Sequence, residues 1–148
     1  NFSLSGNFTV VQSQIDMTDR EFNARKNFER DGQTIKNTRQ MAGQAPYIIN
    51  GGLAYENGGK GLDAGFFYNV KGPTLLVVGS GLYPDVFAQP FHSLNFNLNK
   101  TLGKDQRASI NFNVSNILND VREEVYQSFG AQNQNFTRFS PRTAFSFG

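Results

Sequence analysis

Few residues in this chain of 148 carry side chains that could perform chemistry. His92 is the single histidine and cysteine is absent, so neither a histidine-based nor a thiolate metal cluster is available. The alternation of the surrounding residues puts His92 on the apolar side of a predicted strand, near its end, which favours an interfacial position over a role as a catalytic base. We therefore assign no catalytic, cofactor-binding or metal-binding residue, and we expect a protein that is neither an enzyme nor dependent on a cofactor.

Two further groups of residues are candidates for binding. Asp120, Glu123 and Glu124 have the carboxylates that hard cations prefer, but acidic residues in a long polar connection are usually solvated. Four aromatic residues in the long connections are candidates for ligand contact, although packing between loops or a position at a membrane interface is the favoured interpretation; they are Tyr83, Tyr126, Phe129 and Phe136. The ligand-binding residues stay unknown.

The elements that would position these residues are strands. Six segments alternate apolar with polar side chains at the period of a β-strand, and they cover residues 1–10, 47–55, 62–70, 93–99, 108–115 and 143–147. The polar positions hold mainly Asn, Ser and Gly, and Asp63 is the one charged residue on either face of the six segments. A strand exposed to water on one side normally carries Lys, Glu and Arg there.

The connections between the segments are of two kinds. Residues 56–61 and 101–106 form short turns with glycine, whereas residues 16–45, 72–90 and 117–141 form long loops. Of the 26 charged residues, 11 lie between Asp16 and Arg39. The sequence TDRE at residues 18–21 fits a capping box, which predicts a short helix that ends before Gly32. We expect residues 19–39 to extend charged side chains away from the sheet and not to take part in strand pairing.

A transmembrane β-barrel explains this pattern, because its strands face lipid on one side and a polar lumen on the other. The main alternative fold is a soluble antiparallel sandwich. The longest apolar run, Leu75–Val78, is far shorter than a membrane helix. The net charge of +2, with basic residues spread over loops, argues against nucleic acid as a partner. The first ten residues read as the middle of a strand and not as a signal peptide, so we expect a piece of a longer chain.

Two stretches resemble a known family. Residues 110–126, INFNVSNILNDVREEVY, and residues 138–148, RFSPRTAFSFG, are similar to the C-terminal end of TonB-dependent outer-membrane receptors, in which one strand ends in an Asn-Leu-Asn-like corner and the last strand opens with Pro-Arg. Residues 41–70 resemble a strand, periplasmic turn and strand of the same family. One departure is that this chain stops at Gly148, where the family usually ends in an aromatic residue.

The resemblance implies an all-β fold, in which residues 1–148 are the last six strands of an antiparallel transmembrane β-barrel of roughly 22 strands with a plugged lumen. The implied location is the outer membrane of a Gram-negative bacterium. The implied partners are outer-membrane lipid, the N-terminal remainder of the same barrel with its plug, the TonB complex reached through the plug, and a surface lipoprotein.

The implied activity is energy-driven uptake of a nutrient such as a siderophore, a cobalamin or a glycan. The short turns would then face the periplasm and the long loops the outside. A passive porin is the alternative function, because it shares the lumen chemistry and lacks a plug. An outer-membrane lipase or protease is a further alternative, but it would need a nucleophile and a base, and the single histidine is badly placed for that role.

Overall fold

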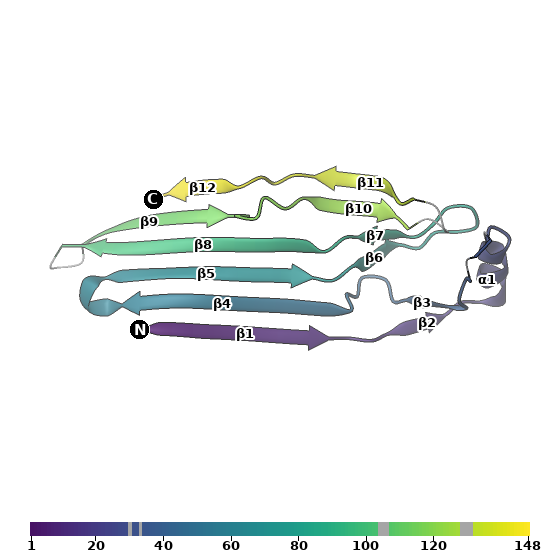
Figure 1. The fold of residues 1–148 in the computed structure, drawn as a ribbon, viewed down its shortest axis with the longest axis horizontal. Helices are drawn as coiled ribbons and strands as arrows, with labels where there is room; N and C mark the ends of the chain where they lie inside the picture. The colour runs from purple at the N-terminus through teal and green to yellow at the C-terminus, as the bar shows by residue number, and fades with distance from the viewer. Residues whose placement is uncertain (30, 33, 104–106, 128–131) are drawn as a thin grey trace.

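The computed structural model describes residues 1–29, 31–32, 34–103, 107–127 and 132–148. These residues form antiparallel β-sheets and one α-helix, and the long strands lie side by side (Figure 1). The predicted all-β antiparallel class is confirmed. Among the described residues, no helix is long and apolar enough to cross a membrane.

The largest sheet has six strands, and each corresponds to one of the six predicted segments. Its strands pair in the order β1-β4-β5-β8-β9-β12; their bounds are Phe2–Val10, Tyr47–Asn57, Leu62–Lys71, Phe91–Leu102, Ala108–Ser115 and Ala144–Phe147. The outer strands β1 and β12 each pair on one side only among the described residues. The sheet is therefore open, and these described residues form no closed barrel.

The three long connections contain more regular structure than the sequence predicted. Each continues a hairpin of the six-stranded sheet as a pair of short strands, and we call these regions the first, second and third extensions, residues 11–46, 72–90 and 116–143 (Figure 1). Their strands are β2 (Gln14–Asp16), β3 (Thr38–Gln40), β6 (Thr74–Val77), β7 (Val86–Ala88), β10 (Arg122–Tyr126) and β11 (Gln134–Phe139). Strands of three to six residues are too short to show a clear period in the sequence.

The first extension carries the predicted helix at its tip. Helix α1 covers Asp19–Lys26, and the Thr18 side chain caps it by accepting a hydrogen bond from the Glu21 backbone N–H at 3.3 Å. The helix ends before Gly32, as predicted. The expectation that residues 19–39 contribute no strand pairing is wrong, because Thr38 and Arg39 pair with β2.

The short turns and both chain termini lie at the opposite end of the sheet (Figure 1). The turn between β4 and β5 is a 3₁₀ helix, η1 (Gly58–Lys60), and the Asn57 side chain accepts from the Lys60 backbone N–H at 3.1 Å. Gly61 ends this turn with a φ of 56°, in the left-handed region that favours glycine. In the turn between β8 and β9, residues 104–106 of the predicted hairpin lie outside the described residues.

The buried hydrophobic side chains gather towards the extensions and not along the long strands. Leu75, Val86 and Val125 belong to the sheet of the second and third extensions, β11-β10-β7-β6, and Val70 lies near the end of β5. The main contacts between elements are those between pairing strands and those of η1 with β5. In the described residues, no second layer packs on the six-stranded sheet, so they do not form the sandwich architecture.

Candidate functional site

One face of the six-stranded sheet is apolar from edge to edge. The strand register joins one side chain from each strand into a row, Phe2, Tyr55, Ala64, Leu98, Phe112 and Phe147. The adjacent row is Leu4, Leu53, Phe66, Phe96, Val114 and Phe145. Neighbouring rings touch, with centroids 4.7 Å apart for Phe66 and Phe96 and also for Phe112 and Phe147. The predicted grouping of these residues on one face is confirmed.

This face is also open to the surroundings. Leu4 is 86% exposed at one edge and Phe147 is 78% exposed at the other, while Phe66 in the middle of the sheet is still 46% exposed. Soluble monomers rarely expose a continuous apolar surface of more than a few hundred Å². The exposed apolar face therefore needs an apolar environment or a partner that covers it.

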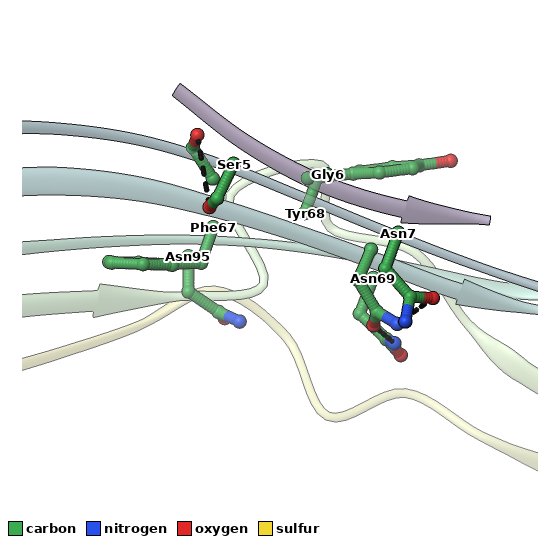
Figure 2. A pocket seen from close by; sticks show the side chains of 10 residues that line it. Ser5, Gly6, Asn7, Phe67, Tyr68, Asn69 and Asn95 are labelled. Carbon is green, nitrogen blue, oxygen red and sulfur yellow. Dashed lines mark hydrogen bonds between the residues drawn. The ribbon is translucent and has the colours of Figure 1, made fainter. Parts of the chain in front are cut away.

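The other face is polar and nearly free of charge. Asn7, Asn50 and Asn69 are aligned across three strands. Asn50 Nδ2 donates to Asn7 Oδ1 at 3.5 Å, and Asn69 Nδ2 donates to Asn50 Oδ1, so the amides form a ladder across the strands (Figure 2). A shallow hollow of about 330 Å³ lies beside this ladder, and Ser5 and Asn95 also line it. Amide groups arranged this way can hydrogen-bond to water or to polar protein groups.

Phe67 is a large apolar residue on the polar face, and it borders the hollow of Figure 2. A Cβ atom at Gly65 would lie 2.7 Å from the Phe67 ring, and one at Gly52 would lie 3.4 Å from it. The ring thus lies over two glycines, one of them two positions away on its own strand and the other opposite it on β4. The flat placement of Phe67 depends on these glycines, because a side chain at Gly65 would collide with the ring.

A buried ion pair connects the first two extensions, and no pattern in the sequence predicted it. Arg25 in α1 donates from both terminal nitrogens to Asp85, at 2.9 and 2.7 Å, and also to the Gly79 carbonyl at 3.2 Å. Arg25 is 5% exposed and Asp85 9%. The hydrogen bonds from Asp85 raise the pKa of Arg25 above its ordinary value, despite the opposing effect of burial. Glu21 adds a further pair, accepting from Arg39 Nε at 3.2 Å.

His92 lies where the sequence predicted, on the apolar face beside Val70 of β5. Its ring Nδ1 lies 2.6 Å from the Tyr68 hydroxyl, and its backbone N–H donates to Asp120 Oδ2 at 2.6 Å. Among the described residues, no acid–base partner suited to nucleophilic catalysis contacts the ring.

The three candidate acidic residues do not come together. Both carboxylate oxygens of Asp120 accept backbone N–H groups, from His92 at 2.6 Å and from Val121 at 2.8 Å. Glu123 and Glu124 are consecutive in β10, so their side chains project to opposite sides. Glu123 pairs with Arg138 at 3.0 Å and Glu124 accepts from Thr137 at 2.8 Å. No group of three potential metal ligands occurs in the part of the chain that the structure describes.

The candidate aromatic residues are dispersed. Tyr126 and Phe136 pack together with ring centroids 5.3 Å apart, whereas Tyr83 is 72% exposed on the second extension. Phe129 lies outside the described residues. Tyr126 and Phe136 therefore pack within the third extension, which is one of the two interpretations that the sequence favoured.

Asn116 is the centre of the corner between β9 and the third extension. It is buried and has a φ of 51°. Its Nδ2 donates to the carbonyls of Asp120 and Arg142, at 3.0 and 3.3 Å, and its Oδ1 accepts from the Asp120 backbone N–H at 3.1 Å. In the Asn-containing corner that carries the family resemblance, the Asn116 side chain therefore joins residues 120 and 142 by hydrogen bonds.

Comparison of the chain with protein-family models, with curated proteins and with solved structures finds no match. Function is therefore inferred from the two faces of the sheet and from the residues of its extensions.

Proposed function

We propose that residues 1–148 are the last six strands of the β-barrel of a TonB-dependent outer-membrane receptor, as the resemblance of residues 110–126 and 138–148 implies. The observation that carries the proposal is the exposed apolar face, which is continuous across six strands and lies back to back with a polar face that carries few charges. Outer-membrane lipid would cover the apolar face. The amide ladder would line the lumen and bind water or the plug.

The energetics of a bilayer favour this arrangement. Lipid solvates exposed Phe and Leu side chains, whereas an Arg at the midplane of the lipid face costs ~2–4 kcal/mol. The two apolar rows that include Phe66 and Phe112 contain no charged residue. Hydrogen bonds between neighbouring strands satisfy the backbone, as hydrocarbon requires.

The dimensions also agree with a membrane wall. Strands β4, β5 and β8 have 11, 10 and 12 residues, and a tilted transmembrane strand needs about 9–11. Short turns at one end and long extensions at the other are typical of outer-membrane barrels. The free edges of β1 and β12 would pair with the N-terminal remainder of the same barrel, which removes exposed edges.

The receptor would take up a nutrient of the siderophore, cobalamin or glycan class, driven by the TonB complex acting through the plug. The charged first extension, together with a surface lipoprotein, would face the outside and capture the ligand.

TonB dependence tests this function. Cells that express the full-length receptor would be supplied with radiolabelled ferric siderophores, cobalamin and oligosaccharides, with and without TonB. We expect uptake of one class, and we expect deletion of TonB or collapse of the proton gradient to abolish it. Uptake that persists under both conditions would reject the receptor and support a passive porin.

A further inference from the structure

Two basic residues and one aromatic residue border the same hollow where the six-stranded sheet meets the extensions. Lys71 at the end of β5 is paired with Phe91 at the start of β8. Arg122 at the start of β10 places its guanidinium carbon 4.7 Å from the centre of the Phe91 ring. The three residues border a hollow of about 290 Å³, together with Asn69 and Gln89. Asn69 belongs to the amide ladder, so the hollow adjoins the polar face.

The positive charges in this hollow are not neutralised by hydrogen-bonded acids. In the part of the chain that the structure describes, neither Lys71 nor Arg122 takes part in a side-chain hydrogen bond or an ion pair. Glu123 and Glu124 also border the hollow. Arg138 neutralises the charge of Glu123, whereas Thr137 donates a hydrogen bond to Glu124 and leaves its negative charge in place.

Three other basic residues of the extensions differ in this respect. Arg25, Arg39 and Arg138 all pair with an acid, at 2.7, 3.2 and 3.0 Å. Lys71 and Arg122 are also exposed to solvent. They are therefore free to bind an anion that arrives from outside.

We propose that Lys71 and Arg122 bind the carboxylate or phosphate group of a soluble ligand. The cation–π contact with Phe91 holds the Arg122 guanidinium over the ring, and among the described residues its side-chain N–H groups have no hydrogen-bond partner and can donate to an anion. Lys71 adds a point charge from the neighbouring strand. The site deepens the proposed function by naming the chemistry of the nutrient, and it rests on that function for its position at the external mouth of the lumen.

Calorimetric titration of the full-length receptor in a zwitterionic detergent tests the site, with citrate and inorganic pyrophosphate as probes. We expect saturable binding of at least one probe, weakened by added salt. The double variant Lys71→Gln, Arg122→Gln should bind at least about tenfold more weakly, because it lacks both charge-assisted contacts.

A matched control removes the same charge elsewhere. The double variant Lys60→Gln, Arg107→Gln changes two exposed basic residues at the short turns, at the opposite end of the sheet, and should bind like the wild type. Absence of saturable binding of both probes, or equal weakening in the two double variants, would overturn the site.

Two further measurements distinguish a soluble ligand from a lipid headgroup, and the anion site from the receptor function. Titration in nanodiscs that contain phosphatidylglycerol should give the same affinity, whereas weaker binding there would assign the site to a lipid headgroup and overturn a soluble ligand. TonB-dependent uptake is measured separately. TonB-dependent uptake without anion binding would overturn the anion site and leave the receptor function standing. Anion binding with uptake that does not depend on TonB would overturn the receptor function and leave the anion site standing.

Discussion

Arg25 and Asp85, which are 60 positions apart in the chain, form a two-pronged buried salt bridge with N···O distances of 2.7 and 2.9 Å. Asp85 Oδ1 also accepts the Gly79 backbone N–H at 2.7 Å, so the pair fixes the backbone of the second extension as well as helix α1. The charged first extension is therefore anchored to its neighbour and is not a free loop.

Replacing Arg25 by Ala should loosen both extensions. The change leaves the Asp85 carboxylate buried without its partner, a loss of ~3–5 kcal/mol for a buried pair. Hydrogen–deuterium exchange of the full-length receptor should show faster exchange at Gly79 and in α1, with β4 and β5 unchanged. The double variant Arg25→Met, Asp85→Leu should lose less protection because it leaves no unpaired charge. Unchanged exchange in Arg25→Ala would mean that the pair does not anchor the extensions.

The long strands could be predicted from the sequence because each alternates over four or more positions. The segment predicted at residues 108–115 is β9 itself, and the one predicted at residues 62–70 ends one residue before β5 does. The extensions could not be predicted in the same way. Leu75 and Val86 belong to strands of four and three residues, where a period of two cannot be distinguished from a short apolar run.

The polar contacts outside the strands depend on distant parts of the chain. No local pattern connects Arg25 with Asp85, and the Asp120 carboxylate, a candidate cation ligand by type, is occupied by the backbone N–H groups of His92 and Val121. The position of Phe67 does have a local signal, because Gly65 precedes it by two positions and leaves space for its ring.

Asn116 should be sensitive to substitution at the corner after β9. Asn116 adopts a left-handed backbone conformation with a φ of 51°. Alanine has no side-chain amide to support this conformation, which costs ~1–2 kcal/mol for a residue with a Cβ atom. Asn116→Ala also removes three hydrogen bonds of the side chain. Asn116→Gly removes the same bonds without the conformational cost. We expect the Ala variant to unfold at lower urea concentration than the Gly variant, and both below the wild type. Equal midpoints for Ala and wild type would reject the structural role.

Cysteine labelling should establish which end of the sheet faces outside. The chain has no native cysteine, so Asp31→Cys, Gln132→Cys and Gly59→Cys each introduce one site. A large membrane-impermeant maleimide added to intact cells should label the first two, which lie in the first and third extensions. Gly59→Cys in the turn η1 should react only after the outer membrane is permeabilised. If Gly59→Cys alone is labelled in intact cells, the proposed orientation is wrong and the short turns face the outside.

The central claim is that lipid contacts one face of the sheet and not the other, and matched arginine substitutions test it most directly. Phe96 and Phe112 lie on the apolar face, and Asn97 and Asn113 are their neighbours on the polar face. Each would be changed to Arg in the full-length receptor, and assembly would be measured by heat-modifiable gel mobility. We expect Phe96→Arg and Phe112→Arg to lose the folded band, because an Arg in lipid costs ~2–4 kcal/mol, and we expect Asn97→Arg and Asn113→Arg to keep it. Equal assembly of all four variants would contradict a membrane wall.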